Sequence, residues 1–220
     1  MSASFAKPEG KGPFPAVVLL HSCGGVDTHM SVWSDFLTAR GYAVLTVDSF
    51  GSRGLGRCPN GTSPIFFSQT EMVSDAYGAL DYLAAQPDIA ADRVYVMGFS
   101  LGGWTISTLA AKPSFSREGR NFKAGMVLYA PCYYQGRLTF PTMVVIGSLD
   151  GPEIASCELA IERKTSPDLE VHILEGVYHA FDQDRGTTIR YDVGGRPMLY
   201  NRGAVYKSEQ LVEAFLAKHR

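Results

Sequence analysis

A serine flanked by two glycines is the first feature of this 220-residue chain that could do chemistry. The segment Gly98-Phe99-Ser100-Leu101-Gly102 follows a strand-like run, RVYVM, and opens a helical pattern, LGGWTISTLAA. A serine held in a tight strand-to-helix turn leaves no room for side chains two residues before and after it, so glycine is needed there. Such a turn lifts the hydroxyl above the carboxyl ends of the strands, where open α/β sheets bind ligands. The pattern predicts Ser100 as a nucleophile.

The same turn has two other interpretations. Ser100 could be a helix cap beside glycines that serve only packing, because a bare G-x-S-x-G also arises by chance. A dinucleotide-binding turn is disfavoured, because the G-x-G-x-x-G spacing is absent. The strand before the motif and the helix after it favour the nucleophile.

A serine hydroxyl is a weak nucleophile unless a neighbouring base takes its proton. In folds with this turn the acid follows the serine along the chain and the histidine comes last. His179 lies in a loop just beyond a predicted strand, which makes it the candidate base, although a loop histidine can also be a solvated bystander. The other four histidines precede Ser100, lie within a strand or sit at the C-terminus: His21, His29, His172 and His219.

The acid of the set is expected after the strand TMVVI, and Asp150 stands there in the segment GSLDG. Its task would be to orient the imidazole and stabilise its protonated form. The alternative is a helix N-cap, which an aspartate before Gly-Pro-Glu often provides. Asp182 and Asp184 compete for the same role but lie too close to His179 in sequence to come from the right strand.

Two backbone amides could stabilise a developing oxyanion. The Leu101 N–H lies at the start of the helix after Ser100, and the Cys23 N–H lies in the loop HSCGG after the first clear strand. The Cys23 thiol is a rival nucleophile, but no comparable turn carries it.

Apolar strand-like runs alternate with helical patterns over the whole chain, which is typical of parallel βαβ units. We expect one doubly wound, mostly parallel sheet with helices on both faces, in a single domain over residues 1–220. The long Gly-, Ser- and Pro-rich segment 49–68 shows no obvious element. The predicted strands are 15–20, 42–47, 93–97, 124–129, 142–146 and 169–174, and the predicted helices are 31–40, 69–85, 101–112 and 205–218.

The composition narrows the class of protein. Hydrophobic residues make up 45% and charged residues 19%, and the formal net charge is -2. The chain therefore has no basic excess for binding nucleic acid. No apolar run approaches the roughly 18 to 20 residues that span a bilayer, so we expect no membrane partner. No secretory leader is visible, which favours the cytoplasm; a periplasmic or secreted protein stays open if a leader has been removed.

The four cysteines lack the spacing of a zinc site or of a redox CxxC pair, so no metal is expected. Two interpretations stay open. The thiols could be free and buried, as in most chains without a leader. Alternatively, two disulfides could join Cys23 to Cys58 and Cys132 to Cys157, because each of these residues follows a predicted strand or begins a helix on one side of the sheet.

Five segments together resemble the dienelactone hydrolase family of the α/β-hydrolases: PFPAVVLLH, VDSFGSRG, GFSLGG, GSLDG and YHAFD. The resemblance spans nearly the whole chain, and the order of Ser100, Asp150 and His179 fits it. It implies the α/β-hydrolase fold, no large lid, no cofactor, and hydrolysis of lactones or short esters.

The chain departs from the dienelactone-cleaving members at three positions. In the members that this chain resembles, a cysteine stands at the place of Ser100 and a glutamate at the place of Ser22. Those members also bind the carboxylate of the lactone with two arginines. Arg53 matches one of them, although it could instead form an ion pair that orders its loop. Gln183 occupies the place of the other. The sequence therefore favours a serine carboxylesterase for small esters or lactones.

Three alternatives to this function stay open: a true dienelactone hydrolase, a non-catalytic binding module, and transfer of the acyl group to an alcohol or thiol. Aromatic side chains could line an apolar pocket, although core packing is the default for each of them. These are Phe99 and Trp104, the two preferred for substrate binding, and Phe66, Phe67, Tyr133 and Tyr134.

The family usually has further strands ahead of PAVVLL, whereas here only ASFAKP is available to form an edge. We therefore expect reduced N-terminal strands and an exposed sheet edge. Because exposed edges invite pairing, the chain could be a monomer or a homodimer.

Overall fold

The computed structural model describes residues 2–58, 64–111, 120–192 and 194–220, with the side chains of 64–69 left aside. The strands are β1 (Ser2–Ala6), β2 (Phe14–Leu20), β3 (Ala43–Asp48), β4 (Ile89–Phe99), β5 (Gly125–Leu128), β6 (Thr142–Gly147), β7 (Leu169–Leu174), β8 (Arg190–Tyr191) and β9 (Pro197–Met198). The helices are α1 (Thr28–Thr38), α2 (Pro64–Ala84), α3 (Leu101–Ala111), α4 (Glu153–Arg163) and α5 (Arg202–Lys218), with a short 3₁₀ turn over Gly51–Arg53.

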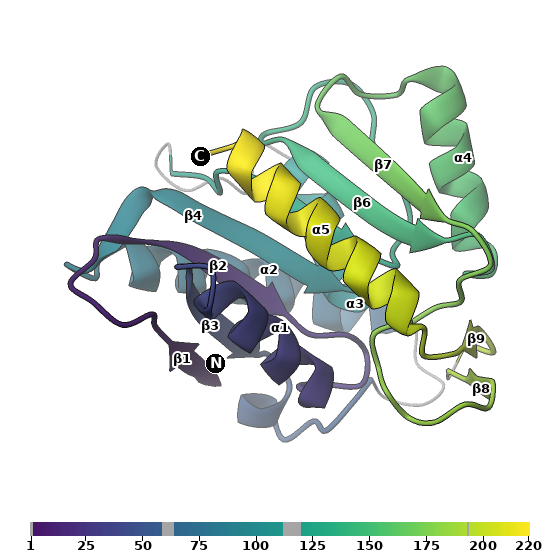
Figure 1. Ribbon diagram of the computed structural model, residues 1–220, viewed down its shortest axis with the longest axis horizontal. Helices are drawn as coiled ribbons and strands as arrows, with labels where there is room; N and C mark the ends of the chain where they lie inside the picture. The colour runs from purple at the N-terminus through teal and green to yellow at the C-terminus, as the bar shows by residue number, and fades with distance from the viewer. Residues whose placement is uncertain (1, 59–63, 112–119, 193) are drawn as a thin grey trace.

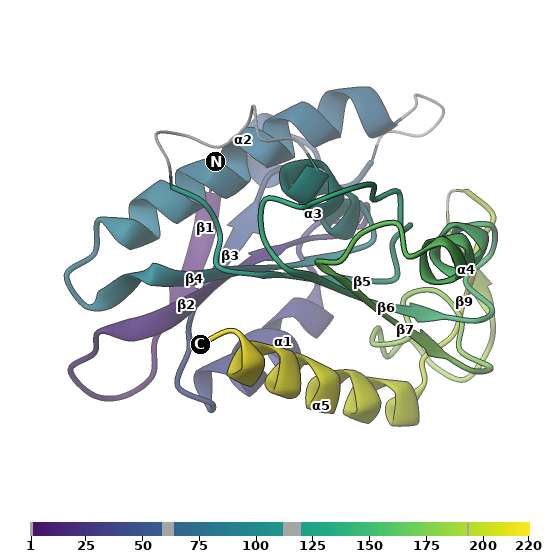
Figure 2. The ribbon, with the colours of Figure 1, turned by 90° about the horizontal axis from the view of Figure 1, so that it is seen from above.

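Seven strands form one sheet in the order β1-β3-β2-β4-β5-β6-β7. All neighbouring pairs are parallel except β1, which runs antiparallel to β3. The N-terminal segment thus supplies one edge strand, as the sequence predicts. Helices α2, α3 and α4 pack on one face of the sheet and α1 and α5 on the other (Figures 1 and 2). The predicted α/β-hydrolase architecture is confirmed.

Strand β2 shows why the sheet has a core on each face. Its residues are almost all apolar, and alternate side chains of a strand point to opposite faces. Val18 and Leu20 pack beneath α2 and α3, whereas Val17 and Leu19 pack beneath α1 and α5. A run of apolar residues without polar alternation therefore fits a strand that is covered on both sides.

The helix boundaries follow local capping and turn chemistry. The Asp27 carboxylate accepts a hydrogen bond from the Thr28 N–H and caps α1 at its first residue. The chain leaves α1 through Gly41, whose positive φ of 87° suits glycine. On α2 the predicted apolar stripe is buried against the sheet, with Met72, Ala76, Ala79, Leu80 and Leu83 at its centre.

Three features differ from the sequence prediction. The sequence shows no obvious element in segment 49–68, but the structure has the 3₁₀ turn and the start of α2 at Pro64 there. Helix α4 was not predicted, because its sequence has only a narrow apolar stripe, with Cys157 and Ala160 buried. The β8–β9 hairpin was also missed, since its two-residue strands are too short to show periodicity.

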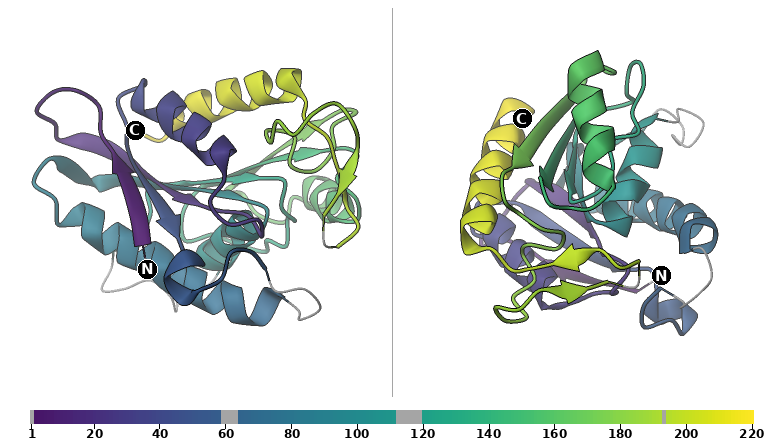
Figure 3. Two further views of the ribbon diagram at one scale, coloured as in Figure 1. Left: turned by 90° about the horizontal axis from the view of Figure 1, so that it is seen from below. Right: turned by 90° about the vertical axis from the view of Figure 1, so that its right-hand side faces the viewer.

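The carboxyl ends of the parallel strands lie together at one end of the sheet, toward which the arrows in Figure 1 point. Ser100 follows β4, Asp150 follows β6 and His179 follows β7. The β8–β9 hairpin lies at the same end of the molecule, as Figures 1 and 3 show. Among the described residues, no helix is long and apolar enough to cross a membrane.

The core beneath these carboxyl ends contains a buried histidine whose protonation we expect to affect stability. His29 of α1 is 3% exposed and packs edge-on against Phe99, and neither ring nitrogen has a hydrogen-bond partner among the described residues. Burial lowers the pKa of His29, against an opposing contribution from the charge of Asp182.

Because the unfolded chain takes up this proton near pH ~6.5 and the folded chain resists it, stability is retained above that pH and falls as the pH drops below it. We expect His29→Leu to make the free energy of unfolding fall less steeply between about pH 6.5 and pH 5. Urea unfolding at several pH values measures this slope. Equal slopes for the two proteins would contradict the burial argument.

Candidate functional site

Ser100 sits in the strained turn that its sequence predicts. Its φ is +52°, in the left-handed region, and α3 begins at the next residue. A Cβ on Gly98 would lie 2.4 Å from the Gly102 carbonyl group, and one on Gly102 would lie 2.2 Å from the Leu20 carbonyl oxygen. Both glycines are therefore required because backbone from two other segments fills the space a side chain would need.

Three residues distant in sequence meet beside this turn. The His179 Nε2 lies 3.1 Å from the Ser100 hydroxyl oxygen, and the His179 Nδ1 lies 2.6 Å from Asp150 Oδ1. All three side chains are buried or nearly so. Since a carboxylate only accepts, Nδ1 carries the proton, and Nε2 is left to accept from the Ser100 hydroxyl. The arrangement can take a proton from Ser100 and stabilise the resulting imidazolium.

Backbone contacts between the loops after β6 and β7 bring Asp150 and His179 together. The Leu149 N–H donates to the Val177 carbonyl oxygen at 2.9 Å. A Cβ on Gly147 would lie 2.1 Å from that same oxygen, so the glycine permits the close approach. The helix-cap alternative for Asp150 does not hold, because Pro152 occupies the N-cap position of α4.

Asp150 is fully buried, and its second oxygen has no partner in the described part of the chain. Burial raises the pKa of the Asp150 carboxyl, while the hydrogen bond from His179 and its charge act in the opposite direction. Removing water from a carboxylate makes its remaining hydrogen bond electrostatically stronger. The geometry therefore favours a fixed ring orientation for His179.

Asp182, the competing acid, binds other side chains, and the carboxylate bonded to His179 is that of Asp150. Its two carboxylate oxygens accept hydrogen bonds from Trp33 Nε1 at 2.8 Å and from the Tyr129 hydroxyl at 2.9 Å. The Tyr129 ring packs edge-on against the imidazole of His179, with ring centroids 4.9 Å apart. Burial, followed by the charge of Asp182, raises the pKa of Tyr129 well above its usual value. Asp182 thus anchors the tyrosine that supports the histidine.

The loop after β2 carries the two remaining predicted residues near the serine, Ser22 and Cys23. A disulfide joins Cys23 to Cys58, and the Cys58 N–H donates to the Cys23 carbonyl oxygen at 2.8 Å. A second disulfide joins Cys132 to Cys157. Of the two interpretations of the cysteines, the structure has the disulfides in the predicted pairing. The Cys23 sulfur is therefore not a free nucleophile.

Buried His21 holds this loop from below. Its Nδ1 donates to the Ser22 carbonyl oxygen at 2.7 Å, and its Nε2 accepts from the Ser49 N–H at 3.2 Å. Burial lowers the pKa of His21, against smaller opposing contributions that begin with the hydrogen bond to Ser22. A neutral ring has one donor and one acceptor, which is the combination these two contacts need. The loop that presents the Cys23 amide is thus fixed by both the disulfide and this ring.

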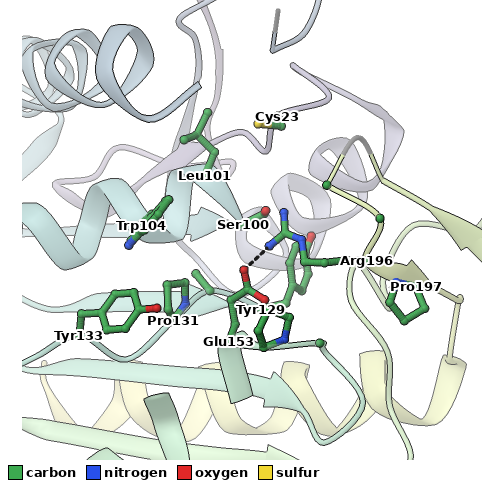
Figure 4. Close-up of a pocket in the computed structure, with 15 residues that line it drawn as sticks. Cys23, Ser100, Leu101, Trp104, Tyr129, Pro131, Tyr133, Glu153, Arg196 and Pro197 are labelled. Atoms are coloured by element: carbon green, nitrogen blue, oxygen red, sulfur yellow. Dashed lines mark hydrogen bonds and ion pairs between the residues drawn. The ribbon is translucent and has the colours of Figure 1, made fainter. Parts of the chain in front are cut away.

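A cavity of about 370 Å³ opens beside Ser100. Figure 4 shows Leu101, Trp104, Pro131 and Tyr133 around it, with Arg196 reaching in from the β8–β9 hairpin. The Leu101 and Cys23 segments border both the cavity and the serine. The Leu101 amide is the first of α3, where N–H groups lack an intrahelical acceptor.

The structure brings some of the predicted substrate-binding residues to this site and not others. Trp104 lines the cavity of about 370 Å³, and Ser22 lines a second cavity beside Ser100. Phe99 is instead fully buried in the core against His29, so the core-packing alternative describes it. Arg53 is held away by Asp75, at 2.8 and 3.1 Å, and by the Ser49 carbonyl oxygen, which matches its ion-pair alternative.

The remaining aromatic candidates also divide. Tyr133 lines the cavity and stays 62% exposed, whereas Tyr134 is buried and pairs with Ser107. The side chains of Phe66 and Phe67 lie outside the described part of the structure.

Sequence reasoning missed Arg196 and Glu153. The Arg196 guanidinium donates to Glu153 Oε1 at 3.1 Å and to Asp192 Oδ2 at 2.7 Å, and both Arg196 and Glu153 line the larger cavity (Figure 4). The segment DVGGRP signals a turn, but nothing in it indicates which loop the turn would cover. Among the described residues, no cluster of His, Cys, Asp and Glu could hold a metal ion.

The sequence profile of the dienelactone hydrolase family matches residues 1–219. The chain belongs to the dienelactone hydrolase family. The fold is similar to that of a candidate dienelactone hydrolase from Klebsiella pneumoniae subsp. pneumoniae MGH 78578, which superposes with a TM-score of 0.73 at 18% identity, over 98% of this chain and 92% of that one.

Two curated proteins are similar to this chain in sequence. The candidate hydrolase YtaP of Bacillus subtilis (strain 168) is 34% identical over 129 residues, which is 47% of this chain and 42% of YtaP. A candidate 2-oxo-3-(5-oxofuran-2-ylidene)propanoate lactonase of Bradyrhizobium sp. is 26% identical over 198 residues, which is 82% of this chain and 79% of the lactonase. The match thus spans less than half the length of YtaP.

The close approach at Gly102 gives a structural test of the turn. We expect Gly102→Ala to lower the free energy of unfolding by about 1–3 kcal/mol, because the new methyl group would collide with the Leu20 carbonyl group and push α3 away from β2. Gly56→Ala is the matched control, since a Cβ there meets nothing within 4 Å. Urea unfolding compares the two. Equal stabilities of the two variants would show that the turn can accommodate a side chain in place of Gly102.

Proposed function

We propose that this chain is a serine carboxylic ester hydrolase, acting as one domain on small, short-chain esters or lactones. The observation that carries the proposal is the continuous hydrogen-bonded array from Ser100 through His179 to Asp150, with distances of 3.1 and 2.6 Å. Membership of the dienelactone hydrolase family supports the same class of reaction.

In the first half of the reaction the Ser100 oxygen attacks the ester carbonyl carbon while His179 Nε2 takes the hydroxyl proton. Asp150 holds the ring and stabilises its positive charge. The carbonyl oxygen becomes an oxyanion, which the amides of Leu101 and Cys23 stabilise. When the tetrahedral intermediate collapses, the bond to the alcohol oxygen breaks, and His179 gives the proton to the leaving alcohol. The acyl group is then bound to Ser100 as an ester.

In the second half water replaces the alcohol. His179 takes a proton from the water as its oxygen attacks the acyl carbon, and it returns that proton to Ser100 when the acyl–enzyme bond breaks. The net reaction converts an ester and water into an acid and an alcohol. A lactone would follow the same steps, with acid and alcohol remaining in one molecule. An acceptor alcohol or thiol in place of water would give acyl transfer by the same residues.

Two observations weigh against dienelactone itself as the substrate. The one arginine at a lactone-gripping position, Arg53, is engaged with Asp75, and Gln183 stands at the other position. The cavity beside Ser100 is mostly apolar in lining and small, which suits a short acyl chain. A non-catalytic binding role would not require the buried hydrogen-bonded array of Ser100, His179 and Asp150.

Removal of the nucleophile is the direct test of the proposal. We expect Ser100→Ala to lower the turnover of a short-chain aryl ester by about 10⁶-fold, because the three residues act as a unit. A fluorophosphonate probe should label the wild-type protein and not the variant. Circular dichroism and the melting temperature serve as the control for folding. A folded variant with wild-type turnover would refute the role of Ser100.

The two disulfides give a matched test of the Cys23 amide. They close loops of similar length, with sequence separations of 35 and 25, so the loss of either is expected to cost about 3–4 kcal/mol of unfolding free energy. The Cys23–Cys58 bond fixes the loop of the proposed oxyanion donor, whereas the Cys132–Cys157 bond ties α4 to the segment after β5.

We expect the double variant Cys23→Ala/Cys58→Ala to lose about tenfold more kcat than Cys132→Ala/Cys157→Ala. Part of one oxyanion hydrogen bond would be lost with the loop's fixed position. Steady-state kinetics on one aryl ester and melting temperatures measure both effects. Equal kcat values in the two variants would separate the disulfide from oxyanion stabilisation.

A further inference from the structure

Two cavities of different chemistry meet at Ser100. The first, of about 370 Å³, has the mostly apolar walls described above, with Trp104 and Pro131 among them. The second, of about 230 Å³, is also lined by Ser100, and its lining includes four arginines. Ser100, Cys23, Tyr129 and Arg196 border both cavities, so a bound ester can extend into each of them.

The position of His179 assigns the two halves of the ester to the two cavities. In the proposed mechanism the imidazole gives its proton to the leaving alcohol oxygen, so the alcohol must leave on the side of the ring. Of these two cavities, His179 lines the second and not the first. The alcohol half therefore belongs in the arginine-lined cavity, and the acyl half belongs in the apolar one.

Two of the four arginines in the second cavity are already neutralised. Arg196 pairs with Asp192 and Glu153, and Arg185 pairs with Asp27. The other two, Arg57 and Arg190, have no ion-pair partner within the part of the chain that the structure describes. They leave an uncompensated positive charge beside a buried nucleophile, where an anionic group would be attracted.

Strand pairing fixes the position of Arg190 relative to the catalytic ring. Met198 pairs with His179 on one side and with Arg190 on the other. Residues directly opposite one another in a sheet project from the same face, and neighbouring strands are about 4.8 Å apart. The backbone of Arg190 thus lies roughly 10 Å from that of His179, two strand spacings away, with its side chain on the same face.

Arg57 lines the same cavity from a different segment of the chain. It precedes Cys58, whose disulfide and N–H bind it to the Cys23 loop. The two unpaired arginines therefore belong to two segments that are each tied to the site by an independent contact: one to the loop of Cys23 and one to the strand beside His179. Such a pair can hold an anion at a set distance from the ester oxygen.

We propose that the second cavity is a subsite for an anionic alcohol, so that the preferred substrates join a short apolar acyl group to an alcohol bearing a carboxylate or similar anion. Arg57 and Arg190 bind the anion, and neither is a residue at a lactone-gripping position of the family. The inference rests on the proposed roles of Ser100 and His179. Hydrolysis then releases the apolar acid and, with the proton from His179, the anionic alcohol.

Matched aryl esters test the subsite through turnover. Meta-carboxyphenyl butyrate and meta-carbamoylphenyl butyrate share ring, acyl group and shape and differ in one negative charge. We expect the wild-type kcat/KM to favour the carboxylate about tenfold, the size of one charge-assisted hydrogen bond at a partly exposed site. Phenyl hydrogen glutarate carries its carboxylate on the acyl side instead, and it should show no preference over phenyl butyrate.

The variant to compare is the double substitution Arg57→Gln/Arg190→Gln, which should reduce the carboxylate-to-amide ratio to about one. Arg137→Gln is the matched control, because Arg137 is 85% exposed and lies near the amino end of β6, away from Ser100. Its ratio should equal that of the wild type. A wild-type ratio near one, or a ratio that persists in the double variant, would overturn the subsite.

A binding measurement keeps this test independent of catalysis. The affinity of Ser100→Ala for meta-hydroxybenzoate and for meta-hydroxybenzamide, measured by calorimetry, should differ about tenfold and lose that difference when Arg57→Gln/Arg190→Gln is added. Equal affinities refute the subsite even if ester hydrolysis depends on Ser100. Conversely, selective binding of the anion by a protein that hydrolyses neither ester supports the subsite and refutes the proposed function.

Discussion

The site depends on one steric constraint, the close approach of α3 to the end of β2. The Gly102 backbone lies so near the Leu20 carbonyl group that no side chain fits between them, and Gly98 is confined by the same turn. This packing holds Ser100 in the left-handed region with a φ of +52°, a conformation that costs energy in an isolated chain. Packing on the sheet retains it, and the hydroxyl is held where an imidazole can reach it.

The partners of Ser100 come from strands whose carboxyl ends share an edge. Parallel pairing of β4, β5, β6 and β7 sets the positions from which Asp150 and His179 start. Backbone contact between the loops then sets the final distances, with Gly147 permitting it. Asp150, His179 and Ser100 therefore meet without long-range adjustment of their side chains, since each follows a strand of the sheet.

The surroundings of the site are built from opposed charges. Arg196 is held by Glu153 and Asp192 at the boundary between the two cavities, so its charge is largely balanced there. Arg57 and Arg190 have no such ion-pair partner among the residues that the structure describes. An apolar cavity and an arginine-lined cavity meet at Ser100, and of the two only the arginine-lined one includes His179. Under the proposed mechanism this places the leaving group in the arginine-lined cavity.

The sequence by itself determined the fold class and the glycines that the turn requires. It also indicated that Ser100, Asp150 and His179 each follow a different strand. It could do so because apolar runs, turns and βαβ order are local signals, and parallel strands bring their carboxyl ends to one edge. It left the state of the cysteines open. It also missed α4 and the β8–β9 hairpin, whose periodicity is weak or too short.

Only the tertiary structure decided which charged and aromatic side chains face the site. Arg53 turns to Asp75, Phe99 enters the core, and Arg196 arrives from a hairpin that nothing local connects to Ser100. The physical reason is that the direction of a long side chain depends on partners far away in sequence. The residues around it in the sequence do not identify those partners.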